Sequence, residues 1–268
     1  MDNKLNNKKI LWLNIVSVFA VMIIYTIIGE IRPRVDDYIA DRFITQLILL
    51  TLALIAAKIT SKLYTLKFKT EGFGEGYKAG MVEVVYMLYI LISAILKPVF
   101  YPELAPTASL PKIILFIIDM LMLGIGEETL FRGILLNGFS DYYGETSTAL
   151  IRKGVIISGI AFGAVHLLNI VGNDSIIDPI IQALCDIPSG ILYGAIYIRS
   201  KKNIWPIITI HAIFDLGGFI GRGVLTDSFV ASSAVSCFTV SAIVFSIVEL
   251  VVGLYILRDK KLNELIKK

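Results

Sequence analysis

The sequence predicts an all-α membrane protein, a bundle of about eight transmembrane helices that encloses a polar site. Two observations predict this fold class. The 268-residue chain is 56% hydrophobic and has a mean hydropathy of +0.77, which excludes an ordinary soluble domain. Its apolar residues are also grouped into runs close to the roughly 17–25 residues that a helix needs to cross a bilayer.

Short polar breaks separate these apolar runs, for example Arg32-Pro33-Arg34, Lys97-Pro98 and Gly172-Asn173-Asp174. The first run is too long for a signal-peptide core and lacks a small-x-small cleavage site, so we interpret it as an uncleaved span. The second and seventh runs are short, and we expect them to tilt or to thin the bilayer locally. We predict a single transmembrane domain over residues 1–268, with spans at 10–29, 43–57, 79–96, 113–137, 153–171, 179–198, 205–219 and 230–257.

The distribution of lysine and arginine predicts the orientation. With an even number of spans, both termini share one side with the loops near 58–78, 152–153 and 199–202. That side carries about three times as many basic residues as the other, and positive charge marks the cytoplasmic side. We therefore expect both termini in the cytoplasm, and the few basic residues of the opposite side are Arg32, Arg34, Arg42, Lys97, Lys112 and Arg222.

Ionisable residues interrupt the apolar runs. Glu127, Glu128 and Arg132 lie within the run 113–137, and the only two histidines, His166 and His211, also lie in apolar runs. A charge at the bilayer centre costs at least ~2.5–3.5 kcal/mol on insertion scales, so such residues mark functional sites by default. The chain is therefore expected to be an enzyme that works inside a membrane.

The predicted topology places these residues at overlapping depths. At a rise of 1.5 Å per residue, Glu127 lies ~15 Å, His166 ~20 Å and His211 ~9 Å from the cytoplasmic ends of their helices. Three separate helices thus bring expensive polar groups into one band. We predict a single polar site in the cytoplasmic half of the bundle.

Spacing along the helix assigns roles to the acidic residues. Adjacent residues point about 100° apart, so Glu127 and Glu128 cannot face one water molecule. Glu128 and Arg132 are four residues apart in the favourable order, and we assign them as a structural ion pair. Glu127 is then the free carboxylate, suited to act as a general base for water, and the imidazole of His166 could share that work.

His211 and Asp215 are also four residues apart and are expected to present a second polar face to the same cavity. Other polar groups in the apolar runs stand singly, and we expect near-interface, pore-lining or packing positions for Glu83, Asp119, Asp186 and Glu249. Cys185 and Cys237 have no metal or redox spacing and are interpreted as buried small hydrophobes. The net charge of +3 is small, and no basic block indicates nucleic acid.

Zinc is the competing chemistry. Glu127, His166 and His211 could supply the two imidazoles and one carboxylate of a catalytic zinc site with an open position. The zinc-protease spacing His-Glu-x-x-His is absent. We favour no cofactor, and both metal-free and zinc-bound water stay open at this point.

The motifs resemble those of the CAAX-protease and bacteriocin-processing family of intramembrane endopeptidases, also called the Abi family. The resemblance covers residues 112–219 and rests on Glu127-Glu128-x-x-x-Arg132, Phe162-x-x-x-His166 and His211-x-x-x-Asp215. It implies an eight-helix bundle that hydrolyses a peptide bond of a membrane-associated or leader-type peptide. It also implies that Glu127 and His166 activate the water, while His211 and the residue at 215 stabilise the oxyanion.

Asp215 departs from the usual pattern of the family, which has Asn more often than Asp at this position. An ionised Asp only accepts hydrogen bonds and cannot serve an oxyanion directly. Two roles therefore stay open for Asp215. It is held in its protonated form, or it orients His211 so that the imidazole donates the hydrogen bond.

Two further functions stay open. The chain could be a catalytically idle membrane interaction or immunity protein, or a small-molecule or proton transporter, although the inverted repeats typical of transporters are not found. The expected partners of the protease are a membrane-associated peptide or protein substrate and the lipid bilayer, without nucleic acid. A composition rich in Lys, Ile and Asn is compatible with an AT-rich genome, so we expect a bacterial plasma membrane.

Overall fold

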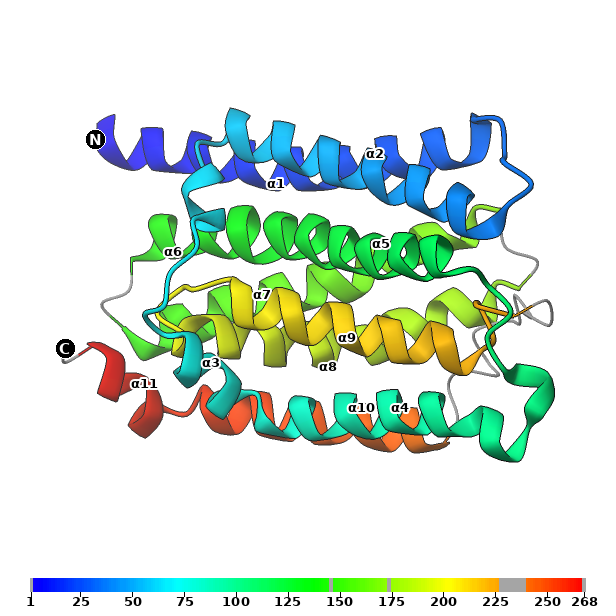
Figure 1. Cartoon of the computed structure of the whole chain (residues 1–268). Helices are drawn as coiled ribbons and strands as arrows, with labels where there is room; N and C mark the ends of the chain where they lie inside the picture. The colour runs from blue at the N-terminus through cyan, green and yellow to red at the C-terminus, as the bar shows by residue number, and fades with distance from the viewer. Residues whose placement is uncertain (1, 145–146, 173–174, 227–239, 267–268) are drawn as a thin grey trace.

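The computed structural model describes residues 2–144, 147–172, 175–226 and 240–266. Every regular element in these ranges is a helix (Figure 1), which confirms the predicted all-α class. The long helices are α1 (Asp2–Ile31), α2 (Tyr38–Ile59), α4 (Met81–Phe100), α5 (Leu110–Glu128), α7 (Thr148–Val165), α8 (Ile177–Arg199), α9 (Trp205–Gly221) and α10 (Val240–Ile256). The shorter helices are α3 (Phe73–Ala79), α6 (Asn137–Tyr143) and α11 (Asp259–Ile266).

Each predicted span corresponds to one of the long helices. Five helical stretches are long and apolar enough to cross a membrane, at Asn6–Ile31, Tyr38–Ile59, Met81–Phe100, Thr148–Ile170 and Ile177–Arg199. Helix α9 and the apolar part of α10 are shorter, at Trp205–Gly221 and Ile243–Ile256. Part of the predicted eighth span, residues 230–239, lies outside the described residues, and so does Cys237.

The second predicted span is longer than expected. Helix α2 has 22 residues, because it continues through polar residues that the apolar pattern leaves out. Asp41 forms an ion pair with Arg32 at 2.7 Å, and Arg42 reaches Asp119 of α5 at 3.0 Å. These partners offset the cost of carrying charges at the end of a span. The expectation of a short second helix was therefore wrong.

The fourth predicted span is not one uniform helix. Helix α5 ends at Glu128, a π-helical segment follows over Thr129–Leu136, and α6 continues to Tyr143. A π-helical turn is wider than an α-helical one and is frequent at functional sites. Here it begins directly after the paired glutamates, and the apolar period of the sequence gives no sign of it.

The helices lie in layers (Figure 1). Helices α1 and α2 form one outer layer and α4 and α10 the opposite one, while α5, α7, α8 and α9 lie between them. Helix α7 packs along α8, α2 along α5, α4 along α9, and α10 along α8. The two ends of the chain lie at the same end of the bundle, as an even number of crossings requires.

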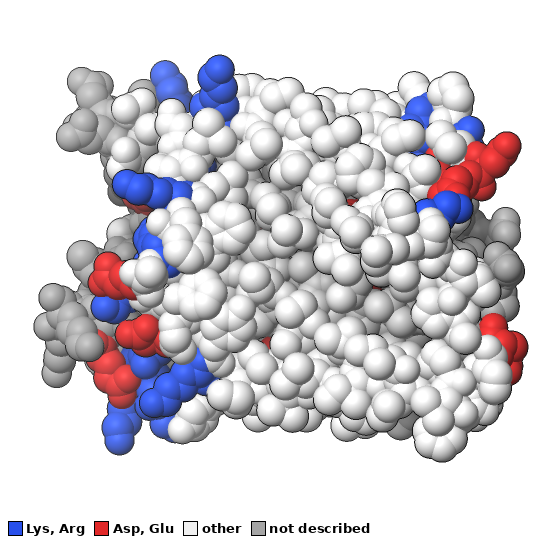
Figure 2. Space-filling view, in the orientation of Figure 1, with Lys and Arg blue, Asp and Glu red and all other residues white. Residues whose placement is uncertain are grey.

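The surface carries an apolar belt. Figure 2 shows one face on which Lys, Arg, Asp and Glu gather at the two ends and other residues fill the middle. Along α4, for instance, Val85, Ile92 and Ile95 are all exposed. Such a broad exposed apolar surface suits hydrocarbon and not water. Together with the apolar helices, it identifies an integral membrane protein.

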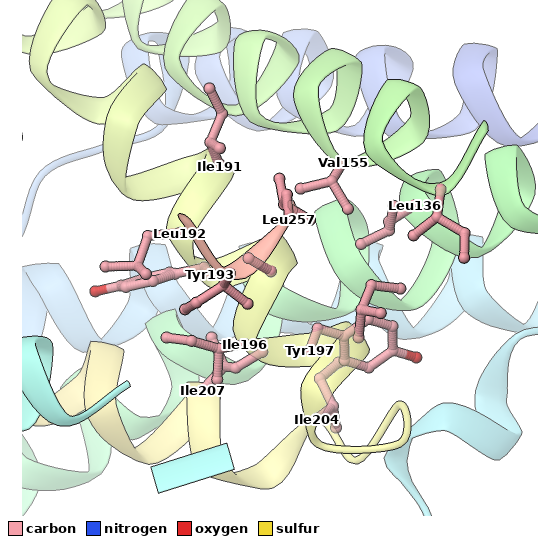
Figure 3. Packing of buried hydrophobic residues seen from close by; sticks show 14 of the residues in the cluster. Leu136, Val155, Ile191, Leu192, Tyr193, Ile196, Tyr197, Ile204, Ile207 and Leu257 are labelled. Carbon is pink, nitrogen blue, oxygen red and sulfur yellow. The ribbon is translucent and has the colours of Figure 1, made fainter. Parts of the chain in front are cut away.

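Helix α8 runs through the centre of the bundle. All its residues from Gly190 to Ile198 are buried, as is typical of a helix surrounded by others (Figure 3). Its approach to α7 depends on glycine, because a Cβ added at Gly159 would lie 2.6 Å from the backbone nitrogen of Ile191. A Cβ added at Gly163 would likewise lie 2.7 Å from the backbone nitrogen of Ile187, so the C-terminal half of α7 lies against the middle of α8.

Candidate active site

The predicted site residues come from neighbouring helices of the middle layer. Glu127 and Glu128 end α5, His166 follows α7, and His211 and Asp215 lie on α9. All are largely shielded: the side chains of Glu127, His211 and Asp215 are 12%, 8% and 19% exposed. These side chains are therefore nearly, but not fully, buried inside the bundle.

His211 is surrounded by carboxylates. Its Nδ1 lies 2.9 Å from Oε1 of Glu128, and its Nε2 lies 3.7 Å from Oε2 of Glu127 and 3.4 Å from Oδ2 of Asp215. A carboxylate oxygen accepts, so Nδ1 donates to Glu128. The other nitrogen then faces the space between Glu127 and Asp215.

Glu128 and Arg132 form the expected ion pair, with NH1 of Arg132 3.0 Å from Oε1 of Glu128. Arg132 also donates from NH2 to the carbonyl oxygen of Gly190 at 3.0 Å, which ties the π-helical segment to α8. The prediction of a purely structural pair was too narrow. The same Oε1 of Glu128 accepts from His211, so this ion pair also holds an imidazole of the site.

His166 has a different environment. Its Nδ1 lies 2.9 Å from the carbonyl oxygen of Phe162 and 3.4 Å from Oδ2 of Asp186 on α8. A carbonyl oxygen only accepts, so Nδ1 carries the proton and Nε2 of the neutral ring is left as an acceptor. The sequence predicted that Asp186 stands singly, and this prediction was wrong. Its carboxylate lies beside Nδ1 of His166, where it can orient the ring.

Asp186 was not predicted to be a site residue, although its depth in the membrane matches that of His166. In the predicted spans, His166 lies near the end of one run and Asp186 near the start of the next, so both have a similar depth. The depth argument applied to Glu127 and the two histidines also applies to Asp186. Only the rotation of α8 about its axis, which sequence does not show, decides that Asp186 faces His166.

An aromatic ring connects the two histidines. The Phe162 ring lies edge-on to both imidazoles, with centroids 5.2 Å from His166 and 6.1 Å from His211. Among the described residues, no hydrogen bond or ion pair joins His166 to Glu127 directly. Glu127 nevertheless interacts electrostatically with both imidazoles. The structure thus brings Glu127, His211 and Asp215 into contact and places His166 beside them.

The other acidic residues expected to stand singly also have partners. Asp119 pairs with Arg42, as described above. Glu83 on α4 accepts from the hydroxyl of Tyr193 at 3.0 Å, and Glu249 on α10 accepts from Ser189 at 2.9 Å. Sequence alone could not pair these residues, because each partner lies on a different helix. Cys185 is buried, as expected, and is not in a disulfide.

The zinc alternative requires three ligand atoms about 2.0–2.2 Å from one point. Within the described ranges, no group of three His, Cys, Asp or Glu side chains has an arrangement that could hold a metal ion. His166 turns Nδ1 away to Phe162 and Asp186, whereas His211 lies among carboxylates that it already contacts. The residues do not fit a zinc site in this arrangement, and we derive no step through a metal.

Comparison with known proteins adds an independent observation. Residues 109–217 match the family model described as type II CAAX prenyl endopeptidase Rce1-like. An uncharacterized 24.3 kDa protein of Escherichia coli is 34% identical over 97 residues, which cover 35% of this chain and 43% of that protein. The aligned part is therefore less than half of that relative. No solved structure matches the chain significantly.

The central region of this chain, residues 109–217, is similar to the Rce1-like family. The match confirms the resemblance to CAAX proteases that the sequence motifs indicated. The Rce1-like region runs from the start of α5 to near the end of α9 and contains every residue of the predicted site, and also Asp186. Helices α1, α2, α4 and α10 lie outside it.

Proposed function

We propose that the chain is an intramembrane endopeptidase, with residues 112–219 as its catalytic core. The observation that carries the proposal is the pairing of Glu127 with His211, whose Oε2 and Nε2 atoms lie 3.7 Å apart inside an apolar bundle. A carboxylate beside an imidazole can activate water and stabilise the charge that develops on a carbonyl. The similarity to the Rce1-like family supports this class of reaction.

Glu127 and His166 are the residues that would activate the water. Glu127 has no Lys or Arg partner among the described residues, so its carboxylate is available as a base. The Nδ1–H of His166 donates to Phe162, so Nε2 offers a lone pair to a water proton. Asp186 supports this tautomer, because a carboxylate beside Nδ1 favours the proton there.

His211 is the residue that would stabilise the oxyanion. In the protonated imidazolium both ring nitrogens donate, and Glu128, Glu127 and Asp215 are the acceptors that face them. Glu128 holds Nδ1, which aims the Nε2–H into the space beside Glu127. Of the two roles open to Asp215, this arrangement supports the one in which it orients His211.

The reaction then follows general acid–base chemistry. Glu127 takes a proton from water as its oxygen attacks the carbonyl carbon, and the carbonyl oxygen becomes an oxyanion that accepts from His211. The carbon–nitrogen bond breaks when the protonated Glu127 returns its proton to the leaving amine. The products are one peptide with a new carboxylate and one with a new amine.

The substrate we propose is a membrane-associated or leader-type peptide that enters from the cytoplasmic side of a bacterial plasma membrane. Lys and Arg gather mostly at the end of the bundle that holds both termini (Figure 2). A reporter inserted near Lys67 should therefore report the cytoplasm, and one near Asp174 the outside. The opposite result would invert the proposed orientation and its link to a cytoplasmic substrate.

The catalytic proposal is tested with purified protein in proteoliposomes and a library of lipid-anchored peptides whose cleavage is followed by mass spectrometry. The change Glu127→Gln should abolish cleavage and leave the Tm close to that of the parent, because the amide has a similar shape but is a very poor base. Glu71→Gln, which removes an exposed carboxylate paired with Lys201, is the control and should keep full activity. Turnover retained within about tenfold in Glu127→Gln would remove Glu127 from the general-base role.

A further inference from the structure

A buried tyrosine packs against the proposed catalytic centre from the side of α8. The Tyr193 ring centroid lies 5.5 Å from that of the His211 imidazole and 5.3 Å from the guanidinium carbon of Arg132. The Phe162 ring contacts the same two groups, at 6.1 Å and 4.6 Å. Arg132 and His211 are thus both bounded by two aromatic rings. A change in the position of Tyr193 would move the imidazole.

The hydroxyl of Tyr193 is fixed by a second layer of buried acids. It donates to Oε1 of Glu83 at 3.0 Å, and Glu83 is 0% exposed. The carboxyl of Glu249 lies close enough to that of Glu83 to interact with it electrostatically, and it accepts from the hydroxyl of Ser189 at 2.9 Å. Two carboxyl groups this close inside an apolar bundle repel each other when both are ionised, and the hydroxyl groups of Tyr193 and Ser189 each offset part of that cost by donating to one of them.

This acid pair lies outside the Rce1-like region. Glu83 belongs to α4 and Glu249 to α10, the two helices of one outer layer (Figure 1). Tyr193 links this acid pair to the site, because its hydroxyl donates to Glu83 while its ring packs against the imidazole of His211. Polar groups that only join helices stabilise the bundle. Contact with the imidazole of the site gives this network a second role.

We propose that Tyr193 is a positioning residue, held by the Glu83–Glu249 pair, that fixes the imidazole of His211 for oxyanion stabilisation. This inference rests on the proposed function for its catalytic meaning. Its structural part, that the Tyr193 hydroxyl sets the environment of His211, does not depend on the proposed function. The two parts are tested by separate measurements on the full-length protein.

The chain offers a matched control for Tyr193. Tyr197 lies one turn later on α8, is 1% exposed, and accepts a hydrogen bond from Nδ2 of Asn137 at 2.8 Å. Figure 3 shows both rings within the core around α8, with their hydroxyl groups pointing in opposite directions. Tyr193→Phe and Tyr197→Phe each remove one buried hydroxyl from the same helix, and only the first touches the site.

The first measurement does not require activity. The chain has only two histidines, so ¹⁵N-histidine labelling gives two imidazole spin systems, assigned with His166→Ala. Tyr193→Phe should shift or broaden the His211 signals and leave those of His166 in place, whereas Tyr197→Phe should move neither. Unchanged His211 signals in Tyr193→Phe, or equal shifts in both variants, would overturn the proposal.

The second measurement is peptide cleavage. Tyr193→Phe should lower kcat about tenfold with KM unchanged, because an interaction made only in the transition state is weakened. Tyr197→Phe should stay within about twofold of the parent. An unchanged kcat in Tyr193→Phe contradicts the positioning role. If the parent protein cleaves nothing, the proposed function fails while the NMR measurement still decides whether Tyr193 positions His211.

Variants of Glu83 separate positioning from folding. Glu83→Gln keeps an acceptor for the tyrosine hydroxyl and a donor for Glu249, so the His211 signals and kcat should remain close to those of the parent. Glu83→Leu removes the acceptor and should reproduce the effects of Tyr193→Phe. Tyr193→Phe alone leaves the buried carboxyl of Glu83 without its hydrogen-bond donor and could prevent folding. In that case the double change Tyr193→Phe with Glu83→Leu removes this carboxyl as well. The double variant should fold, with His211 still displaced. Parent-like His211 signals in Glu83→Leu or in the double variant would overturn the proposal.

Discussion

The two histidines of the bundle lie a few ångströms from one aromatic ring, yet their surroundings differ. His211 contacts three carboxylates and is held at Nδ1 by a glutamate that is itself paired with Arg132. His166 is held at Nδ1 by a backbone carbonyl and one aspartate. In the first environment carboxylates face both ring nitrogens, whereas in the second Nδ1 donates to the carbonyl and Nε2 of the neutral ring is an acceptor.

The difference shows how one apolar bundle can hold two imidazoles with opposite proposed roles. The division depends on which atoms face each ring, since both residues are shielded to a similar extent, with side-chain exposures of 14% for His166 and 8% for His211. Removing a partner of one ring should therefore affect that ring and spare the other. Four predictions test this, from the largest expected effect to the smallest.

The largest effect is expected from the histidines themselves. His211→Ala should reduce kcat by about 10³-fold and lower the Tm, because it removes the proposed oxyanion donor and the imidazole that Glu127 and Asp215 contact. His166→Ala should reduce kcat by about 10²-fold with a nearly unchanged Tm. Cleavage rates and thermal unfolding in the same detergent check both. Equal losses of Tm would show that the two environments do not differ as described.

The second prediction concerns the pair that holds His211. Glu128→Ala and Arg132→Ala should each destabilise the protein by about 3–5 kcal/mol, because each leaves a buried partner without its counter-charge. The double substitution should cost less than the sum, with a coupling of about 0.5–3 kcal/mol. Denaturation of the four proteins in a double-mutant cycle measures this coupling. Strict additivity would mean that the contact between Glu128 and Arg132 contributes nothing.

Much of the fold follows from the sequence, because the length and spacing of apolar runs are set by the bilayer. The eight predicted spans each match a helix. Helices α1 and α2 are clearly longer than expected, and paired charges extend α2. The family was also recognised correctly, because its motifs lie at fixed helical spacings.

The contacts between helices could not be predicted in the same way. A sequence gives the depth of a residue but not the rotation of its helix, so Asp186 and Glu83 were expected to stand singly. Glu128 was assigned to Arg132 because a four-residue spacing is local, whereas its contact with His211 joins residues on two distant helices. The π-helical segment after Glu128 likewise leaves no periodic signal in the sequence.

The third prediction addresses the partner of His166. Asp186→Leu should lower kcat about tenfold, because the imidazole loses the carboxylate that favours its Nδ1 proton. Asp186→Asn keeps an acceptor beside Nδ1 and should lose less activity. In the ¹⁵N-histidine spectrum, both changes should move the signals of His166 and not those of His211. If only the His211 signals moved, Asp186 would act on His211 and not on His166, which contradicts the prediction.

The smallest effect is expected at Asp215, where the chain departs from the commoner Asn of the family that it resembles. Asp215→Asn should keep activity within a few-fold of the parent, because the amide still accepts from Nε2 of His211 and can also donate. The competing zinc chemistry predicts the reverse: a carboxylate ligand lost at 215 should weaken metal binding and reduce activity sharply, with partial rescue by added zinc. Metal analysis of the purified parent and variant separates the two, and stoichiometric zinc that falls on Asp215→Asn would replace the metal-free mechanism. Full activity without bound metal in both proteins, with the His166 signals unmoved, would confine Asp215 to orienting His211.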